Sequence, residues 1–447
     1  MEQAKNQEAT KPITNANWLG EVLPSNFKKY KLGDVAEIVI SSIDKKTKEG
    51  EHKVKLCNFV DVYHNWAITE SMYNSFMIAS ANDKNIERFS LRKGSVAFTK
   101  DSETRNDIGI STYIADNFDD VVLGYHCALV KPNEDILLGK YLNAFMHSDY
   151  IKKYLELNAT GSGMRYTLSV QTLYDMPILL PSVEEQEYIG NIISTIDRKI
   201  AVNRAVNHNL EAMAKQLYDY WFVQFDFPDE NGKPYKSSGG KMVWNEKLKR
   251  EIPEGWEVKS IFEAISVQYG FPFSTEQFTE ERTNVQVVRI RDILEGTTSA
   301  YSLEDTNEKY RLNEGDVLVG MDGNFHMNFW HNNEAYLNQR CVRLRPYGDS
   351  DISSIQILHS ISPYIKAKEQ NAKGSTVGHL SDKDLKGLNL VQSINTMHFN
   401  SRKTLDGLLS LIIRNKKEIL SLTKLRDSLL PLLMNGQVSV NYDLSHD

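Results

Sequence analysis

The chain has few cysteines, and their arrangement does not build a structural framework. Cys57, Cys127 and Cys341 are odd in number and lie far apart in a sequence of 447 residues. Neither a set of disulfides nor a zinc ligand set fits this pattern. The simplest interpretation is three reduced cysteines in a cytoplasmic protein, with Cys127 and Cys341 as small buried side chains.

Long apolar runs and an excess of basic residues are also missing. No run of about 18 apolar residues occurs, so no transmembrane helix is predicted. Residues 1–20 are polar and lack the apolar core of a signal peptide, so a disordered tail is expected. A formal net charge of −7 argues against coating nucleic acid through bulk charge. It does not exclude a DNA reader whose basic residues gather on one surface.

Motifs that would indicate catalysis are absent as well. The sequence has no Walker A loop, no His-Glu-x-x-His, no paired Cys-x-x-Cys and no Asn/Asp-Pro-Pro-aromatic segment. The partial glycine motif "GSGMRY" lacks the third glycine of a dinucleotide-binding loop. The segment "PDENGKPYK" superficially resembles a nuclease core, but Asp229 and Glu230 lie in a Gly/Pro-rich stretch, which predicts a turn. These absences favour a binding protein over an enzyme.

What the sequence does contain is an internal repeat that covers most of its length. The phrases beginning "NATGSG" at residue 158 and "NAKGST" at residue 371 share Asn-Ala, Gly-Ser and a later Leu-Ser. Upstream, "LGYHCALVKP" (123–132) matches "LNQRCVRLRP" (337–346), and "LRKGSVAF" (91–98) matches "LNEGDVLV" (312–319). The front of each copy, residues 23–39 and 252–268, is also similar. Two related mixed modules of short strands and a few helices are therefore predicted.

Each copy runs into a long helical segment with apolar residues at alternating spacings of four and three. Such a heptad seam is typical of a coiled coil. The first seam contains Ile189, Ile193, Ile196, Ile200, Asn203, Asn207, Leu210, Ala214, Leu217 and Trp221. The second contains Leu405, Leu408, Ile412, Asn415, Ile419, Leu422, Arg426, Leu429 and Leu433. The three asparagines either fix the register by pairing in the seam or mark a place where the helices open to solvent.

Four segments resemble, in order, the specificity (S) subunits of type I restriction–modification systems, the HsdS family. They are "LPSVEEQEYIGNIISTIDRKI", "WFVQFDFPDENGKPYKSSGG", "EIPEGWEV" and "LRDSLLPLLMNGQVSV". The resemblance implies an α+β chain with two similar target recognition domains, separated and joined by two long helices that form an antiparallel coiled coil with an internal pseudo-twofold repeat. The expected division is a tail (1–20), domain 1 (21–180), helix 1 (181–227), a linker (228–250), domain 2 (251–392), helix 2 (393–440) and a tail (441–447).

The same resemblance implies function and partners. Each domain would read one half of an asymmetric bipartite site in double-stranded DNA. The chain would dock two adenine methyltransferase subunits and two ATP-dependent motor-nuclease subunits in a bacterial cytoplasm. It would bind no cofactor itself, since S-adenosylmethionine, ATP and Mg²⁺ would belong to the partner subunits.

Candidate DNA-contacting residues come from polar loops that occupy matching places in the two modules. Arg, Lys, Asn, Gln, Ser and Thr read base edges, and Lys and Arg also bind phosphates. In the first module the candidates are Lys100, Ser102, Thr104, Arg105, Asn106, Ser162, Arg165 and Tyr166. In the second they are Asn324, His326, Asn328, Gln339, Arg340, Lys373, Ser375, Thr376 and His379. No catalytic or metal-ligating residue is predicted.

Alternative interpretations stand beside these predictions. Any of the polar loop residues can simply be solvated, and Arg289 and Arg291 are expected to pair with carboxylates such as Asp292. The aromatic residues at the end of the first helix, Tyr218, Tyr220, Trp221 and Phe222, would either cap a local core or anchor a partner. Rival functions are a subunit that serves a methyltransferase without a nuclease, a protein-binding coiled-coil scaffold, and a nuclease at Asp229 and Glu230.

Overall fold

The computed structural model describes residues 26–161, 165–323, 325–372, 378–393 and 401–436. Two compact units are present: Met1–Ile200 with Ser421–Asp447 (unit 1), and Ala201–Leu420 (unit 2). Each unit contains one globular module and part of each of two long helices. Both expected tails fall outside the described residues. Within the described ranges, no helix is long and apolar enough to cross a membrane.

Module 1, in unit 1, is built from short strands in small sheets. Its main sheet has the order β2-β10-β6-β8-β4, and smaller sheets have the orders β5-β3-β9, β11-β12-β7 and β1-β13. The strands are β1 (Lys28–Lys31), β2 (Ala36–Ile40), β3 (His52–Cys57), β4 (Ala67–Ile68), β5 (Met77–Ala81), β6 (Val96–Thr99), β7 (Asp101–Ser102), β8 (Ser111–Ile114), β9 (Val121–Leu123), β10 (Cys127–Pro132), β11 (Thr160–Gly161), β12 (Tyr166–Thr167) and β13 (Pro177–Leu180). The helices are α1 (Leu32–Val35), α2 (Phe59–His64), η1 (Glu70–Ser75), α3 (Asp83–Phe89), η2 (Arg105–Asp107), α4 (Gly139–Met146), α5 (Asp149–Asn158) and α6 (Val170–Tyr174).

Module 2, in unit 2, repeats this plan. A four-stranded sheet has the order β17-β24-β21-β22, beside sheets of order β18-β20-β19-β23 and β16-β25. The strands are β16 (Trp256–Ser260), β17 (Ile265–Tyr269), β18 (Phe278–Thr279), β19 (Val285–Val288), β20 (Tyr301–Ser302), β21 (Val317–Gly320), β22 (Met327–Phe329), β23 (Ala335–Leu337), β24 (Cys341–Pro346) and β25 (Asn389–Ser393). The helices are α8 (Ile261–Ala264), η4 (Thr275–Gln277), α9 (Asp292–Glu295), η5 (Glu308–Tyr310), α10 (Ser354–Ala372) and α11 (Asp382–Lys386).

The central strands of both modules are buried on both faces. Alternate side chains of a strand point to opposite faces of the sheet. On β10, Ala128 and Val130 join one core cluster, whereas Cys127 and Leu129 join the other. On β24 the equivalent Cys341 is separated in the same way from Val342 and Leu344. The predicted repeat is therefore confirmed at the level of the core, and Cys127 and Cys341 are buried as expected.

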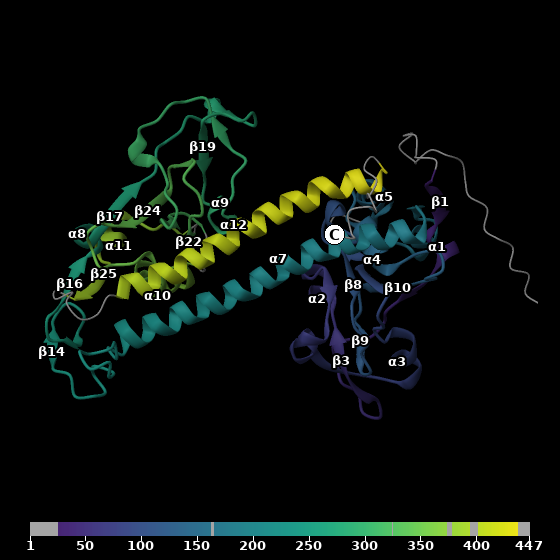
Figure 1. Ribbon diagram of the computed structural model, residues 1–447, viewed down its shortest axis with the longest axis horizontal. Coiled ribbons are helices and arrows are strands. Elements are labelled where there is room, and N and C mark those ends of the chain that lie inside the picture. The colour runs from purple at the N-terminus through teal and green to yellow at the C-terminus, as the bar shows by residue number, and fades with distance from the viewer. Residues whose placement is uncertain (1–25, 162–164, 324, 373–377, 394–400, 437–447) are drawn as a thin grey trace, which may run out of the picture. The chain divides into compact units, whose positions relative to one another are not determined.

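The two long helices are α7 (Val183–Tyr218) and α12 (Ser401–Met434), teal and yellow in Figure 1. The two helices run antiparallel. As the residue number rises along α7, the residue number of its partner on α12 falls. In unit 1 Asp197 meets Arg426, with Asp197 Oδ1 and Arg426 Nη1 2.9 Å apart. In unit 2 Glu211 pairs with Lys416. Most of the predicted seam is buried, including Ile193, Ile200, Leu405 and Ile412.

The seam asparagines fix the register of the helices in unit 2. Asn415 Nδ2 donates to Asn207 Oδ1 at 3.0 Å, and Asn207 Nδ2 donates to the carbonyl of Ile412 at 3.1 Å. Asn203 Nδ2 donates to Glu418 Oε2 at 2.9 Å. All three asparagines are buried. Pairing in the seam is thus confirmed for Asn207 and Asn415, whereas Asn203 pairs with Glu418 beside the seam. Because all three are buried, the alternative of a solvent-facing opening is wrong.

The segment expected to be a plain linker is folded. After α7 the chain passes through a short π-helix, η3 (Asp219–Val223), and then forms a hairpin of β14 (Met242–Asn245) and β15 (Arg250–Pro253). The ring of Phe227 stacks on Tyr235 and on Trp256, with centroids 4.8 Å apart in both pairs. Pro- and Gly-rich stretches also make tight turns, so composition alone could not separate a packed hairpin from a connector.

The aromatic residues at the end of the first helix divide between core and surface. Trp221 and Phe222 are buried in the core of unit 2, as the core-capping interpretation expected. Tyr218 packs against that core, whereas Tyr220 is 37% exposed.

Candidate nucleic-acid interface

In module 1 two predicted stretches far apart in the sequence come together. Strand β7 pairs with β12, which places Ser102 opposite Tyr166 and Asp101 opposite Thr167. The guanidinium of Arg105 lies 5.1 Å from the centroid of the Tyr166 ring. The polar loop after β6 and the segment at residues 165–168 therefore form one surface.

A buried aspartate organises this surface. Asp101 is 6% exposed, and its carboxylate binds Lys100 Nζ at 2.7 Å and the Nδ1 of His126. Arg165 Nη2 lies 3.3 Å from His126 Nε2. Because a guanidinium can only donate, Nε2 accepts and Nδ1 carries the proton that is donated to Asp101. We call Asp101, His126 and Arg165 the module 1 cluster.

The charges around Asp101 keep it ionised. Burial raises the pKa of Asp101, but hydrogen bonds from Lys100, Thr167 and His126 outweigh burial and hold the pKa below its usual range. The anion in turn holds Lys100 in place, and Lys100 Nζ also lies 3.2 Å from Thr167 Oγ1.

The other predicted residues of module 1 lie around this cluster. Thr104, Arg105 and Asn106 are exposed, and the Ser102 hydroxyl accepts a hydrogen bond from the Thr104 amide at 3.3 Å. Ser162 lies outside the described residues.

Module 2 has an aspartate at the equivalent place. Asp322 follows β21 as Asp101 follows β6, and it forms an isolated bridge with His379. Its Oδ1 lies 2.5 Å from His379 Nδ1, and its Oδ2 lies 3.3 Å from Arg340 Nε. We call Asp322, Arg340 and His379 the module 2 cluster. Here too, predicted residues from separate stretches meet.

Arg340 also lines an open hollow of about 470 Å³ on module 2. The lining of this hollow combines predicted and unpredicted residues, all polar except Ile290, namely Arg289, Ile290, Arg291, His326, Asn338, Gln339 and Arg340. Arg289 pairs with Asp292, with Arg289 Nε and Asp292 Oδ2 3.1 Å apart, which confirms the expected ion pair. Arg289 and Arg291 line a neighbouring hollow as well. Three arginines thus border one depression.

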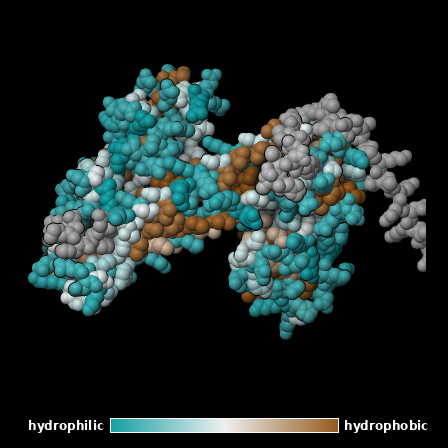
Figure 2. All heavy atoms as spheres, in the orientation of Figure 1, coloured by the Kyte–Doolittle hydropathy of each residue, from teal (hydrophilic) through white to brown (hydrophobic). Residues whose placement is uncertain are grey.

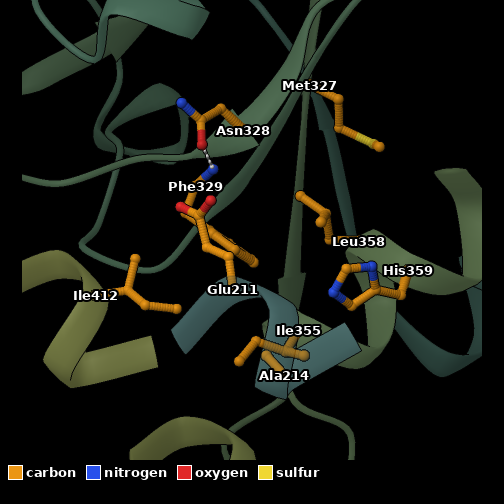
Figure 3. Close-up of a pocket in the computed structure, with 9 residues that line it drawn as sticks. All are labelled: Glu211, Ala214, Met327, Asn328, Phe329, Ile355, Leu358, His359 and Ile412. Carbon is orange, nitrogen blue, oxygen red and sulfur yellow. Dashed lines mark hydrogen bonds between the residues drawn. The ribbon is translucent and has the colours of Figure 1, made fainter. Parts of the chain in front are cut away.

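Asn328 is not brought to that hollow. It lines a smaller one of about 210 Å³ with mainly apolar neighbours, including Ala214, Leu358 and Ile412 (Figure 3). Its Nδ2 lies 3.3 Å from the carbonyls of Ile293 and Leu294, and its Oδ1 accepts from the Phe329 amide. Asn324, Lys373, Ser375 and Thr376 lie outside the described residues.

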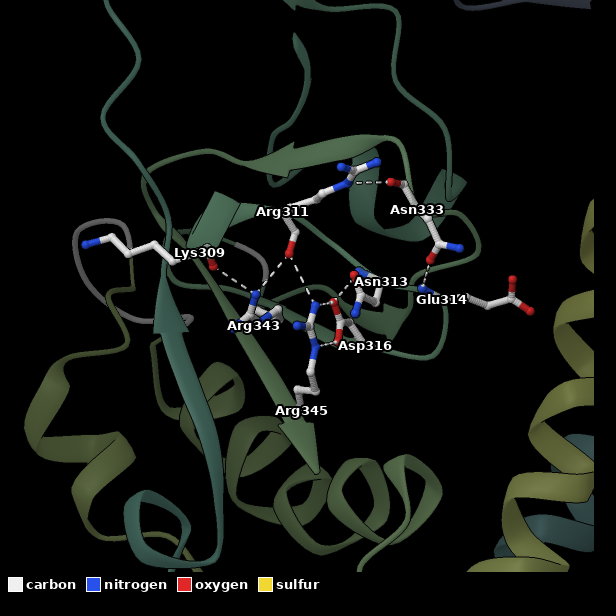
Figure 4. A network of polar contacts seen from close by, with 8 residues as sticks. All are labelled: Lys309, Arg311, Asn313, Glu314, Asp316, Asn333, Arg343 and Arg345. Carbon is white, nitrogen blue, oxygen red and sulfur yellow. Dashed lines mark hydrogen bonds and ion pairs between the residues drawn. The ribbon is translucent and has the colours of Figure 1, made fainter. Parts of the chain in front are cut away.

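A polar network fixes the β24 side of module 2 (Figure 4). Arg343 is 5% exposed and donates to the carbonyls of Lys309 at 3.0 Å and Arg311 at 2.9 Å. Arg345 Nε and Nη2 bind the two oxygens of Asp316 at 2.6 and 2.7 Å. These contacts hold residues 309–316 against the strand that carries Arg340 at its start.

Sequence reasoning missed Asp101, His126 and Asp322. The signal was present, because the aligned segments at residues 91–98 and 312–319 bring Asp101 and Asp322 into register three residues later. His126 and Arg340 likewise precede the aligned Cys127 and Cys341. A carboxylate has no donor for phosphate, so the polar-loop criterion does not select Asp101 and Asp322.

Asp229, a candidate in the nuclease alternative, and the buried cysteines have structural roles. Asp229 Oδ1 accepts hydrogen bonds from the amides of Asn231 and Lys233 at 2.8 Å, which is the expected turn. Burial raises the pKa of Cys127 and Cys341 to about 12, so both thiols stay protonated. No group of three His, Cys, Asp or Glu side chains suited to a metal ion was found among the residues that the structure describes.

Comparison with known proteins identifies related chains. The family model described as type I restriction modification DNA specificity domain matches residues 24–212 and 253–391. The type I restriction enzyme MjaIX specificity subunit of Methanocaldococcus jannaschii is 24% identical over 326 residues, covering 69% of this chain and 71% of that protein. The HindI specificity subunit of Haemophilus influenzae is 21% identical over 474 residues, covering 93% and 100%.

A solved structure has the same fold. The crystal structure of a type I restriction–modification S subunit from M. genitalium aligns with a TM-score of 0.56 at 16% identity, over 91% of this chain and 96% of that one. The two ranges matched by the family model cover most of the chain and coincide with its two modules and the first long helix. The chain therefore belongs to the type I restriction–modification DNA specificity family, as a specificity subunit, the non-catalytic DNA-recognition component.

Proposed function

We propose that the chain reads an asymmetric bipartite site in double-stranded DNA, with one half-site for each module. The observation that carries the proposal is the pair of clusters around Asp101 and Asp322. Both occupy the same place in the scaffold, yet their neighbours differ: Lys100 and Thr167 in module 1, His326 and Gln339 in module 2. Different donors and acceptors at equivalent places read different base edges.

The helix pair would set the distance between the half-sites. α7 and α12 each contribute to both units, and their register is fixed in unit 2 by Asn207 and Asn415. In unit 1 the Asp197–Arg426 pair has the same effect. A helix rises about 1.5 Å per residue, so the 36 residues of α7 extend over about 54 Å.

The same helices would dock the methyltransferase and motor-nuclease subunits. Figure 2 shows hydrophobic residues gathered over the helix pair, whereas the modules are mainly hydrophilic on this face. The exposed apolar side chains of the two helices include Val202, Val206, Met213, Leu411 and Leu425. Exposed apolar groups of this kind are typical of protein interfaces. S-adenosylmethionine, ATP and Mg²⁺ would belong to those partners, which would flip and methylate an adenine in each half-site in the cytoplasm.

The test is to express this chain with the methyltransferase subunit encoded beside it, in a host without DNA methylation. Modified adenines are then mapped by single-molecule sequencing. One asymmetric motif of two short half-sites around a fixed gap is expected. An unmodified genome, with the complex shown to be assembled, would contradict the proposal.

A salt titration separates this proposal from a scaffold that binds only proteins. Contacts with phosphates release counterions, so the logarithm of the DNA association constant falls linearly with the logarithm of the salt concentration. We expect that dependence for the assembled complex on a duplex that carries the mapped motif. A complex whose association with the duplex does not change with salt would favour the scaffold.

A further inference from the structure

The two clusters have the same composition but are built from different positions. After α5 and α10, respectively, each module has a segment that runs back alongside its aspartate, residues 165–168 in module 1 and 378–380 in module 2; we call these the returning segments. In module 1 the histidine, His126, precedes β10, and Arg165 comes from the returning segment. In module 2 the arginine, Arg340, precedes β24 and His379 comes from the returning segment. The returning segments are equivalent, because the amides of Leu168 and Leu380 donate to the carbonyls of Lys100 and Met321, the residues before the two aspartates. Arginine and histidine have exchanged positions, and Arg165 reaches its aspartate through His126 whereas Arg340 contacts Asp322 directly.

The residue before β10 and β24 adopts an unfavourable backbone conformation in both modules. His126 has φ of 72° and Arg340 has φ of 66°, in the left-handed region that glycine prefers. Lys249 and Phe225 are the other non-glycine residues of this kind among the described residues. A residue kept in such a conformation is a hint of function, because glycine would fit the same turn without strain.

The arginines of the clusters remain open to a ligand. The Arg340 side chain is 60% exposed although its Nε meets Asp322, and Arg165 is exposed as well. An exposed ion pair adds little to stability, so contact with Asp322 alone does not account for a strained arginine at this position. A guanidinium oriented by a carboxylate still has donors for phosphate or for the O6 and N7 atoms of guanine.

We infer that Arg165 and Arg340 are DNA-contacting residues, one in each module, and that Asp101 with His126 and Asp322 with His379 are the residues that position them. This inference rests on the proposed function and deepens it. The aspartates act through the arginines and do not touch DNA.

The first test replaces the strained arginine by glycine in the full complex. Arg340→Gly removes both the backbone strain and the guanidinium, so we expect an unchanged melting temperature or one raised by about 1 to 3 °C. Binding to a duplex with the mapped motif should weaken by about tenfold or more, and the salt slope should fall by about one unit. The measurements are thermal unfolding and a salt titration of DNA affinity.

Lys249→Gly is the matched control. Lys249 also has a positive φ, of 52°, and an exposed ion pair in which its Nζ lies 2.7 Å from Glu246. Lys249→Gly should remove backbone strain in the same way, so the melting temperature should change as it does for Arg340→Gly, while the DNA affinity stays unchanged. A lower melting temperature and unchanged DNA affinity for Arg340→Gly would overturn the inference, because the arginine would then be structural.

The second test uses the sign of an electrostatic change. Asp322→Asn removes a negative charge near DNA, which by charge alone would tighten binding. If Asp322 positions Arg340, binding should instead weaken, by about three- to tenfold, and base discrimination at one position should relax. Glu280→Gln is the comparison, since Glu280 lines the neighbouring arginine hollow and its neutralisation should tighten binding.

Tighter binding by Asp322→Asn would overturn the positioning role. Failure of the proposed function itself is distinguishable, because the unaltered complex would then show no salt-dependent preference for the mapped duplex. Asp101→Asn should reproduce the Asp322→Asn result in the half-site that module 1 reads.

Discussion

His331 is buried beside Trp330 at 4% exposure, and neither of its ring nitrogens has a hydrogen-bond partner among the residues that the structure describes. Burial lowers the pKa of His331 to about 4, and the charges of Lys416 and Lys417 act in the same direction. The unfolded chain, with a pKa of about 6.5, therefore binds the proton first as the pH falls. The contribution of the uncharged His331 to the free energy of unfolding is therefore complete above about pH 6.5 and is lost as the pH falls toward 4.

This predicts acid sensitivity that one substitution can reduce. Between pH 7 and pH 5 the unaltered chain should lose about 2 kcal/mol through His331, and His331→Leu should remove that part of the loss. Denaturant unfolding at both pH values measures the difference. An equal loss in variant and parent would show that His331 is protonated in the folded state. His359, whose pKa burial also lowers to about 4, serves as a second site.

Asp316 forms a buried ion pair with Arg345 that should contribute to stability. It is 1% exposed and forms two bonds with Arg345 and one with the amide of Asn313. Asp316→Ala leaves Arg345 without its anion and should destabilise the chain by about 3 kcal/mol. Asp119→Ala is the control, because Asp119 pairs with Arg92 on the surface and its loss should not be measurable. Similar melting temperatures for the two variants would contradict the importance of the network.

Among the structural elements, the long helices depend on their polar contacts for register rather than for stability. Asn415→Leu leaves Asn207 Oδ1 buried without its donor, which should destabilise the helix pair by about 1 to 3 kcal/mol. Asn207→Leu together with Asn415→Leu replaces the pair by apolar contact and should restore or exceed the original stability. Thermal unfolding compares the two variants. A double variant less stable than the single one would show that the asparagine pair itself stabilises the helices.

The helices, the repeat and the buried central strands could be predicted from periodicity and from aligned segments. The hairpin of β14 and β15 could not, because turn residues look the same in a connector and in a packed hairpin. At the candidate interface, the sequence indicated Arg165, Arg340 and His379 through their polar loops. It could not show that Arg340 and His379 meet Asp322, or that Arg165 reaches Asp101 through His126, since these contacts join separate segments that strand pairing and turns bring together.

At the scale of the whole molecule, the helix pair predicts how the target site responds to changes in length. Inserting seven residues into α7 near Ile200 and seven into α12 near Leu420 preserves the heptad phase. The added rise of about 10 Å corresponds to about three base pairs. Methylation mapping should show a longer gap with both half-sites unchanged. A changed half-site sequence would contradict the role of the helices as spacers, and a four-residue insertion, which breaks the phase, is the control.

Unit 1 is completed by the far end of the chain, because Leu430, Leu433 and Met434 of α12 belong to the same core as Ile189 and Ile193 of α7. During synthesis, the ribosome must make residues 201–420 before these side chains exist. At about 5 to 20 residues per second this takes on the order of 10 to 40 s. Throughout that interval the first unit on the ribosome exposes an unfinished apolar surface, and faster translation of residues 201–420 would shorten the exposure.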